Sequence, residues 1–481
     1  MKVRSGHIFA LVLAVCCAFG LGSCIYDHYA DVEVPGTGGG SDYEDSGKGL
    51  LVLRISPLNA TTSGGENNGV EEKIKSLRIV MMQNNESERK TNNTEAPKDT
   101  IEYNGLISFG SGNGISVSGF SHTFTCRATP GEKKFYLIAN EESVGQISFS
   151  ATVSLPQDLG ESPTLTALLD AYKGTDAQDK GKDLEAALEA VTFSRSLPVY
   201  AKAGETGEVF LPYTAFYGGP QFSVEAKSEN GGETVLPKET VLPAIYLVPV
   251  ATKFVFNFYN YRLNEVTINN LAVEPINSEN YLMAKVGETD YYKDFDDKEK
   301  DLYWIDWLKR VANATHSSDP NLANETYGWI LDYEVPSSDA GEKVTLLPSA
   351  VESPSVTVPK GEDKNTEDPN DITPGVLHLG PYYFPECKSS KQDQETAQGG
   401  NTGMESLGQT YLFFLALMDN GNGIELEGMP IESVKALFRN TSVIINVTMK
   451  EGEVEAFAEI ADWNQKSANG WVTEGGKPKD I

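Results

Sequence analysis

The chain has 481 residues and a strong excess of acid, with 69 Asp and Glu against 39 Lys and Arg and a formal net charge of −30. That length is sufficient for two medium domains with separate hydrophobic cores. So large a negative charge argues against nucleic acid and against anionic lipid surfaces as partners, because their phosphates would repel the protein.

The N-terminus carries a short basic start followed by an apolar run. Lys2 and Arg4 precede the run at residues 8–21, which is too short for a membrane span and has the length of a signal-peptide core. It ends in a Leu-Gly-Ser-Cys sequence at Cys24. This sequence resembles the lipobox of bacterial lipoproteins, whose cysteine is acylated and becomes the first mature residue. We expect residues 1–23 to be a signal peptide and Cys24 the lipidation site; an ordinary secretory signal is the alternative.

Residues 24–48 are acidic and rich in glycine, and they show no hydrophobic periodicity. This composition is typical of a flexible tether, because it offers too little apolar surface to form a core. No second long apolar run follows in the sequence. A lipid on Cys24 would therefore be the only membrane anchor of the mature chain.

The next part of the chain, residues 49–238, has the pattern of short β-strands interrupted by two helical segments. The strands show alternating apolar residues or β-branched and aromatic runs, and the helical segments repeat apolar residues at three and four positions. Strands with few helices and glycine-rich turns are typical of an antiparallel β-sandwich. The candidate strands are residues 50–55, 73–83 and 133–140, and the candidate helices are residues 165–172 and 182–191.

A polar stretch punctuated by Gly and Pro, residues 225–243, predicts a domain boundary. We therefore divide the folded part into residues 49–238 and 239–481. The second part contains an apolar strand region, an amphipathic helix, a long polar loop or exposed hairpin, and two β-hairpins with Asn-Gly or Gly turn signals. In that order these segments are residues 244–261, 298–314, 351–375, 409–428 and 440–463.

The sequence offers no constellation of residues for catalysis or metal binding. No histidine pair has zinc-hydrolase spacing, and neither a GxSxG nor a P-loop motif is present. His378 and Cys387 could form a dyad only with an orientation that spacing does not provide, so structural roles are favoured. Cys126 could pair with Cys387 in an oxidising compartment, although lone cysteines are more often small buried residues. Residues 419–425 lack the alternating oxygen ligands of a calcium loop. We expect a structural or binding protein, with no enzyme activity, metal or cofactor.

Four segments, in order, resemble the fimbrillins, the lipoprotein-derived subunits of type V fimbriae. They are a G-x-K-x-x-Y-x-I-x-N strand, an apolar strand opening the second domain, an aromatic Y-x-P-E segment, and a closing Arg-Asn strand with a Trp. Val443 stands where the family usually has tyrosine. The matching positions are Gly131, Lys133, Tyr136, Ile138 and Asn140, then residues 242–258, then residues 380–387, then Arg439, Asn440, Val447 and Trp463.

This resemblance implies a mainly β protein with two transthyretin-like antiparallel β-sandwich domains and a few short helices. It also implies a structural subunit of fimbriae, shaft or accessory, that is exported as a lipoprotein to the cell outer membrane. In the family, a protease cuts after an arginine in the loop following the first strand, and a strand from a neighbouring subunit fills the resulting groove. The implied partners are other fimbrial subunits, through donor-strand complementation, and the outer membrane, through lipid on Cys24.

The loop after the first expected strand departs from the family pattern. Residues 57–69 contain neither arginine nor lysine, and the nearest basic residues are Arg54 and Lys73. Arg54 is therefore the candidate processing site, unless a protease of other specificity acts or no cleavage occurs. An uncleaved chain would keep its first strand and its lipid, as the family's anchor subunits do.

A second hypothesis is a surface lipoprotein that binds a host surface or glycan and never polymerises. Trp304 and Trp307 could form a platform for a sugar, although their helical spacing is more typical of a hydrophobic core.

Overall fold

The computed structural model divides the chain into two units, residues 1–46 and residues 47–481. Every element below belongs to the longer unit. The predicted signal peptide, the tether with Cys24 and the predicted helix at residues 298–314 lie outside the described residues. The structure describes residues 49–58, 70–84, 99–160, 162–174, 179–194, 207–224, 227–228, 234–235, 240–286, 333–336, 342–347, 356–364, 372–388, 411–419, 422–431 and 436–462.

In its described residues, the first half of this unit is made of short strands with two α-helices and four 3-10 turns. The strands are β1 (Gly49–Pro57), β2 (Val70–Ile74), β3 (Ser76–Gln83), β4 (Ile101–Ser108), β5 (Ile115–Ser116), β6 (His122–Ala128), β7 (Gly131–Ala139), β8 (Ser148–Phe149), β9 (Val191–Ser194), β10 (Gly207–Val209), β11 (Tyr213–Tyr217), β12 (Ser223–Val224), β13 (Lys227–Ser228), β14 (Thr234–Val235), β15 (Thr240–Val241) and β16 (Ile245–Pro249). The helices are α3 (Leu165–Asp170), α4 (Gly181–Ala190), η1 (Gly110–Gly112), η2 (Val117–Gly119), η3 (Glu141–Ser143) and η5 (Pro220–Phe222).

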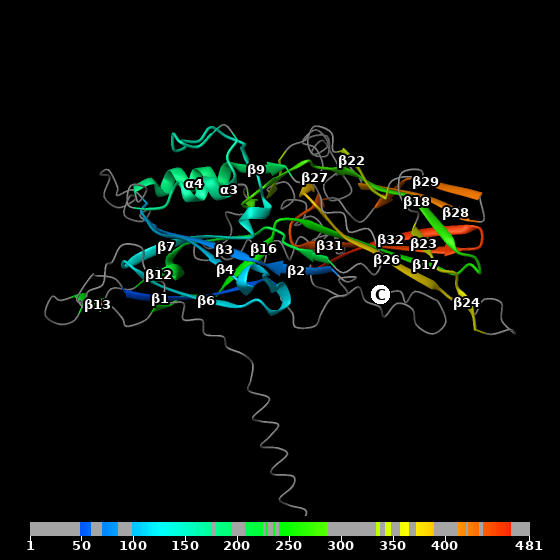
Figure 1. Ribbon diagram of the computed structural model, residues 1–481, viewed down its shortest axis with the longest axis horizontal. Coiled ribbons are helices and arrows are strands. Elements are labelled where there is room, and N and C mark those ends of the chain that lie inside the picture. The colour runs from blue at the N-terminus through cyan, green and yellow to red at the C-terminus, as the bar shows by residue number, and fades with distance from the viewer. Residues whose placement is uncertain are drawn as a thin grey trace, which may run out of the picture. The chain divides into compact units, whose positions relative to one another are not determined.

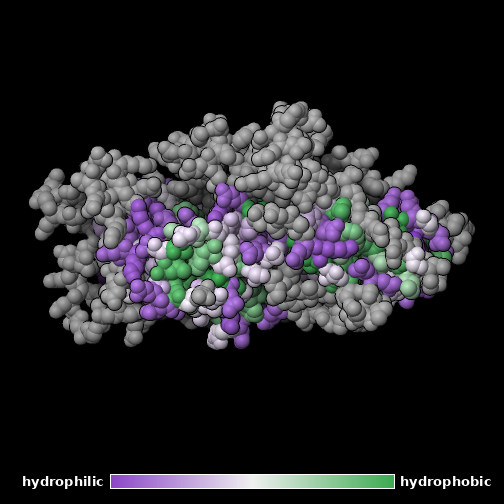
Figure 2. All heavy atoms as spheres, turned by 90° about the horizontal axis from the view of Figure 1, so that it is seen from above, coloured by the Kyte–Doolittle hydropathy of each residue, from purple (hydrophilic) through white to green (hydrophobic). Residues whose placement is uncertain are grey.

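A nine-stranded sheet in the order β15-β1-β16-β11-β7-β3-β4 forms the body of this half, with β6 paired to β1 and β12 to β7 (Figure 1). Alternate residues of its strands face opposite sides. One side encloses a core that includes Leu77 and Ile79 of β3, and the other side, with Val80, packs against α3 and α4. Figure 2 shows the side that carries the helices, where hydrophobic side chains gather over the first half between hydrophilic ones.

The second half is built of strands alone in its described residues. They are β17 (Thr252–Asn260), β18 (Val266–Ile276), β19 (Glu279–Tyr281), β20 (Lys285–Val286), β21 (Tyr333–Glu334), β22 (Glu342–Leu347), β23 (Val356–Val358), β24 (Glu362–Asp363), β25 (Ile372–Thr373), β26 (Gly375–Phe384), β27 (Cys387–Lys388), β28 (Tyr411–Asp419), β29 (Asn422–Ile431), β30 (Ala436–Leu437), β31 (Thr441–Lys450) and β32 (Glu453–Asp462).

Two sheets of this half pack face to face as a β-sandwich. Their orders are β26-β17-β31-β32 and β22-β18-β28-β29, with β23 also paired to β18. Every second residue of β17 from Phe254 to Phe258 is a phenylalanine that is 0% exposed. These three side chains share one core with residues of β18 and β28, so the two sheets pack by burying apolar surface between them.

The mainly β fold expected from the sequence is confirmed, and the two helical segments are α3 and α4. The two expected hairpins are β28–β29 and β31–β32, the latter turning at Gly452 with φ of +74°. Part of the expected polar loop at residues 351–375 is a short antiparallel pair, β24 with β25.

One expected strand region, residues 244–261, is two strands that belong to different sheets. β16 pairs with β1 and β11, whereas β17 pairs with β26 and β31. β16 ends at Pro249, which has no N–H to continue a ladder. The division of the chain between residues 238 and 239 stays a prediction, and the strands change from one sheet system to the other between β16 and β17.

Within the described part of the chain, none of the helices combines the length and the apolar character needed to cross a membrane.

The strand β28 offers a test of the sandwich register. Leu417 is 1% exposed in the second core and its neighbour Met418 is 40% exposed. We expect Leu417→Ala to lower the free energy of unfolding by about 2–5 kcal/mol, because it leaves a cavity, and Met418→Ala to change it by less than about 1 kcal/mol. Urea denaturation followed by far-ultraviolet circular dichroism measures both. Similar losses for the two variants would contradict the register.

Candidate functional site

The first strand, β1, is paired along both of its edges. It runs antiparallel to β6 from Gly49, opposite Ala128, to Ile55, opposite His122. On its other edge it runs parallel to β15 and β16. In the described part of the sheet β6 pairs only with β1, so β1 is the element that joins β6 to the remaining strands.

The side chains of β1 alternate between the core and the surface. Leu51 and Leu53 are 0% exposed and Ile55 is 1% exposed, whereas Leu50 and Arg54 are exposed. Burying each of the three apolar side chains contributes about 1.5–3 kcal/mol as an upper estimate. The inward face of β1 is therefore held by apolar packing, and its backbone by ladder hydrogen bonds.

The predicted processing residue, Arg54, lies inside β1. Its side chain is exposed, and its backbone stands opposite Thr123 of β6. Proteolysis favours exposed loops and transiently opened backbone, so the bond after Arg54 is protected while β1 stays in the sheet. Arg54 as a processing site and Cys24 as the lipidation site both stay predictions, and Cys24 lies outside the described residues.

A buried ion pair links two of the segments that carried the family resemblance. Glu386 follows the aromatic β26 segment and Arg439 precedes β31; they are 1% and 0% exposed. The main-chain N–H of Arg439 donates to Glu386 Oε1 at 2.8 Å, while its Nε and Nη2 donate to Oε2 at 2.9 and 2.6 Å. The carboxylate thus accepts three charge-assisted or main-chain hydrogen bonds from one residue.

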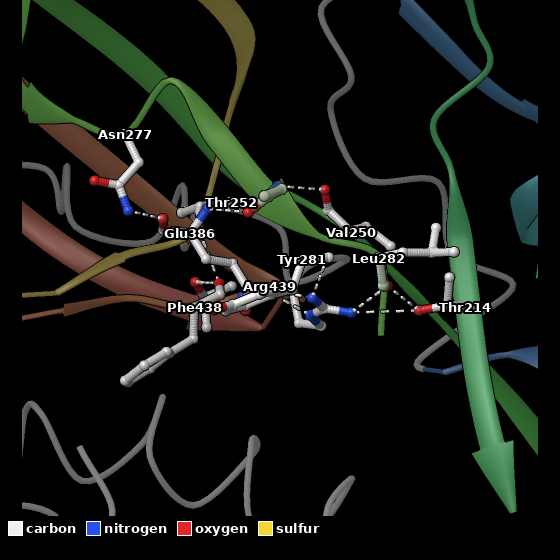
Figure 3. A network of polar contacts seen from close by, with 11 residues as sticks. Thr214, Val250, Thr252, Asn277, Tyr281, Leu282, Glu386, Phe438 and Arg439 are labelled. Carbon is white, nitrogen blue, oxygen red and sulfur yellow. Dashed lines mark hydrogen bonds and ion pairs between the residues drawn. The ribbon is translucent and has the colours of Figure 1, made fainter. Parts of the chain in front are cut away.

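The other side of the same guanidinium reaches the first half of the unit. Figure 3 shows Arg439 extending from Glu386 toward Thr214 and Leu282. Nη1 donates to Thr214 Oγ1 at 3.3 Å and to the Leu282 carbonyl at 3.1 Å, and Nη2 donates to the Tyr281 carbonyl at 2.9 Å. Thr214 belongs to β11, so a single side chain connects the closing motif of the second half to the first-half sheet.

Amide side chains and main-chain groups complete this junction. The Glu386 N–H donates to Asn280 Oδ1 at 2.8 Å, and Asn280 Nδ2 donates to the Val250 carbonyl at 3.1 Å. The Asn440 N–H donates to the Ala251 carbonyl at 3.1 Å. Val250 and Ala251 link β16 to β17, and these bonds satisfy their buried carbonyl groups. A buried carbonyl without a hydrogen-bond partner would lower the stability of the fold.

A second polar contact joins the halves at Glu72 of β2, which is 3% exposed. Its carboxylate accepts hydrogen bonds from the hydroxyls of Tyr213 and Tyr383, each at 3.0 Å, and lies 3.5 Å from Lys253 Nζ. Burial lowers the pKa of Lys253, and the attraction of Glu72 offsets part of that shift. Tyr213 comes from β11 and Tyr383 from β26, so Glu72 is shared between the two sheets.

Asn140, the last residue of the G-x-K-x-x-Y-x-I-x-N motif, has a structural role. Asn140 is 0% exposed and left-handed, with φ of +55°, a conformation that asparagine tolerates better than most residues. Its Nδ2 donates to the carbonyls of Lys73 and Leu211 at 2.8 and 2.7 Å, and its Oδ1 accepts from the Lys75 N–H at 2.8 Å. It thereby fixes the break between β2 and β3.

Buried charges inside the first half were not anticipated from the sequence. Arg78, which is 0% exposed, donates from Nε and Nη2 to Glu141 at 2.8 and 2.6 Å, and from Nη2 to Asp170 at 2.9 Å. Lys133, also 0% exposed, lies 2.9 Å from Glu102. The available signal was a cation inside an otherwise apolar strand, because such a residue needs a carboxylate partner when buried.

The remaining candidates from the sequence do not come together. Cys126 and Cys387 are not joined in a disulfide, and burial raises the pKa of Cys387 to about 11. Cys387 Sγ lies 3.7 Å from the Pro275 carbonyl, whereas His378 Nδ1 lies 2.6 Å from Asn257 Oδ1. The described residues contain no group of three or more His, Cys, Asp or Glu side chains arranged to hold a metal. Trp304, Trp307 and Trp463 lie outside the described residues.

Solved structures that are similar to this chain include fimbrial proteins. The tip fimbrial protein Mfa3 of Porphyromonas gingivalis aligns at 13% identity over 86% of this chain and 100% of its own, with a TM-score of 0.39. A fimbrial assembly protein of Parabacteroides distasonis aligns at 11% identity over 86% and 98%, with a TM-score of 0.31. A fimbrilin of Porphyromonas gingivalis aligns at 8% identity over 87% and 98%, with a TM-score of 0.34.

No protein-family model and no curated protein sequence matches the chain.

The junction can be tested with a double-mutant cycle at Arg439 and Glu386. We expect Arg439→Met to cost about 3–5 kcal/mol in the free energy of unfolding, because it leaves a carboxylate buried without its cation. Adding Glu386→Leu removes that stranded charge, so the double variant should lose less than the sum of the single losses. Urea unfolding gives the three values.

A matched control is Lys450→Met, which removes an exposed pair with Glu455 whose atoms lie 3.6 Å apart. It should change the free energy by less than about 1 kcal/mol. Additive losses at Arg439 and Glu386 would mean that the two side chains are not coupled.

Proposed function

We propose that the chain is a structural subunit of cell-surface fimbriae, exported as an outer-membrane lipoprotein and assembled by exchange of its first strand. The observation that carries the proposal is the position of β1. It is the first described strand, it has nine residues, and it lies between β6 on one edge and β15 and β16 on the other.

Removing β1 would leave a groove with a defined chemistry. The backbone N–H and C=O groups that now pair with β1 would be exposed on both walls, and buried groups of this kind require partners. The floor would lack three apolar side chains, those of Leu51, Leu53 and Ile55. A strand with apolar residues at alternate positions satisfies both needs, as in β-augmentation.

The inward contacts of β1 suit such an exchange. Its buried side chains are apolar, whereas β3 and β7 of the same sheet carry the buried cations Arg78 and Lys133 with specific carboxylate partners. Apolar packing is non-directional, so it tolerates a different strand of similar pattern, while a buried ion pair does not. β1 is thus the replaceable strand of this sheet.

The route to the surface rests on the N-terminal sequence. Lipidation at Cys24 would place the residue 24–48 tether between the membrane and β1. A flexible chain of that length has a root-mean-square span of about 25–30 Å. With such a span, the folded unit would be separated from the lipid surface, whose phosphates would repel a chain of net charge −30. The proposed partners are other fimbrial subunits and the outer membrane.

A second candidate is an uncleaved anchor subunit, and the placement of Arg54 favours it. This residue is paired in β1, and residues 57–69 hold no alternative arginine or lysine. A chain that no arginine-specific protease opens would keep both its first strand and its lipid. It could still donate a strand to the next subunit without accepting one.

Strand exchange can be tested by placing a site-specific protease sequence between residues 59 and 69 of the mature chain. After cleavage and removal of the freed N-terminal piece under mild denaturant, we expect SDS-resistant oligomers on return to buffer. A synthetic peptide of residues 49–57 should block them by refilling the groove. Gel mobility and mass photometry measure both effects.

The matched control peptides separate the two faces of the strand. Replacing Leu51, Leu53 and Ile55 by serine should abolish blocking, whereas replacing Leu50 and Arg54 by serine should preserve it. If the cleaved chain stays monomeric and binds none of the peptides, strand exchange at β1 is ruled out.

The lipoprotein route can be tested by intact mass measurement of the mature protein from its native host. We expect an acylated N-terminus at Cys24 if β1 is kept, and an unmodified N-terminus after residue 54 if Arg54 is cut. Cys24→Ser should move the protein from the detergent phase to the aqueous phase in a phase-separation assay, because it removes the acyl chains. An unprocessed N-terminus at Met1 in surface fractions would contradict the route.

A further inference from the structure

Four polar side chains meet at one end of the first-half sheet, where β4, β3 and β7 lie side by side (Figure 1). They belong to Gln83 at the end of β3, Glu102 of β4, Thr129 in the turn before β7, and Lys133 of β7. Gln83 stands directly opposite Lys133 in the antiparallel pair β3–β7. Paired residues point to the same side of a sheet, so these two side chains are neighbours.

A β-bulge directs Glu102 toward the same place. The register between β3 and β4 shifts between Ile101 and Tyr103, which leaves Glu102 without an opposite residue on β3. A bulge of this kind re-aims a side chain. The Glu102 carboxylate lies 2.9 Å from Lys133 Nζ, and the two side chains are 6% and 0% exposed. The amine and the carboxylate therefore meet in an almost dry site.

The carboxamide of Gln83 is held on both of its ends. Its Oε1 accepts a hydrogen bond from Lys133 Nζ and lies 3.0 Å from Thr129 Oγ1, and its Nε2 donates to the Pro130 carbonyl at 3.2 Å. Gly131 has a φ of +108°, and a Cβ at this position would collide with Gln83 Nε2. The turn before β7 thus fixes the amide in one orientation.

This arrangement places a primary amine against an amide carbonyl with a carboxylate beside it. The carbon atom Cδ of Gln83 is one C=O bond, about 1.23 Å, beyond the oxygen that Lys133 Nζ contacts. Nucleophilic attack needs reacting atoms about 3–3.5 Å apart, so Nζ is close to an attacking position. In an apolar interior a charged pair is costly, which favours transfer of a proton from Nζ to Glu102 and gives the neutral amine.

We propose that Lys133 and Gln83 form an isopeptide bond within the chain. The neutral Nζ attacks Cδ, and the Thr129 hydroxyl donates to Oε1 as negative charge develops there. The Nζ–Cδ bond forms and the Cδ–Nε2 bond breaks. Nζ loses two protons in all: one stays on Glu102, and the other passes to Nε2, which leaves as ammonia. The products are a secondary amide, a neutral Glu102 acid and ammonia, and nothing is oxidised or reduced.

The bond would replace a buried ion pair by neutral groups and would join two neighbouring strands covalently. It closes a loop from residue 83 to residue 133, so it would restrict the unfolded chain as a disulfide does. β3 and β7 would stay attached even when their main-chain hydrogen bonds opened. Neither residue belongs to β1, so the inference holds whether or not the chain exchanges its first strand.

Intact mass measurement of the folded mature chain with Cys24→Ser tests the bond. We expect a mass lower than the sequence mass by one ammonia. Succinimides at Asn-Gly sequences lose the same mass, so tryptic peptide mapping has to locate the loss. Trypsin does not cut after an acylated lysine, and residues 79–89 should therefore be recovered joined to residues 128–134. Tandem mass spectrometry identifies the two linked side chains.

Three variants separate the reacting groups from the proton acceptor. Lys133→Met and Gln83→Met each remove one reacting group, whereas Glu102→Gln keeps both and removes the carboxylate; all three should show the full mass of their sequence. Gln83→Met leaves the buried ion pair intact, so it is the variant expected to fold most like the parent. The matched control is Lys134→Met, the next lysine of β7, which pairs with Glu185 at 2.8 Å. It should keep the ammonia loss. Circular dichroism confirms that each chain is folded.

The proposal is overturned if the folded parent chain retains its full sequence mass. It is also overturned if the loss of ammonia maps to an ester between Thr129 and Gln83, which hydroxylamine cleaves, or to a succinimide. Persistence of the joined peptides in Glu102→Gln would contradict the role of the carboxylate as proton acceptor.

Discussion

The guanidinium of Arg439 is bonded to groups from both halves of the folded unit, and the position of the first strand follows from it. One side of the group is taken by Glu386, and the other reaches Thr214 of β11. β11 pairs with β16, and β16 is the parallel neighbour of β1. Because a buried ion pair is costly to break, the wall of the β1 site is held in one orientation relative to the second sandwich.

Buried charges lie on several strands of the two halves but not on the inward face of β1, the strand proposed for exchange. Arg78, Lys133 and Arg439 each meet a carboxylate in the interior, and Lys253 lies beside Glu72. Such pairs add little net stability compared with well-packed apolar residues, but they disfavour any other arrangement of the strands that carry them. The inward face of β1 has no such residue, so its place depends on shape, apolarity and main-chain pairing alone.

The sequence allowed the local elements to be predicted better than their partners. Alternation and Asn-Gly or Gly turns located β1, β7 and the last two hairpins, because strand period and turn chemistry are local properties. The same patterns did not show that residues 244–261 divide between two sheets, nor that Glu386 and Arg439 meet, because both depend on contacts distant in the chain. Arg78 and Lys253 were overlooked for the same reason, since a cation within an apolar strand indicates a buried partner without saying which one.

The inward and outward residues of β1 differ in what surrounds them. The inward residues fill a groove, and the proposed exchange would require β1 to leave it. Arg54 belongs to the outward set and is exposed. A subunit whose backbone is protected at Arg54 by pairing with β6 is biased toward retention. The proposed strand exchange would begin only when β1 has been released.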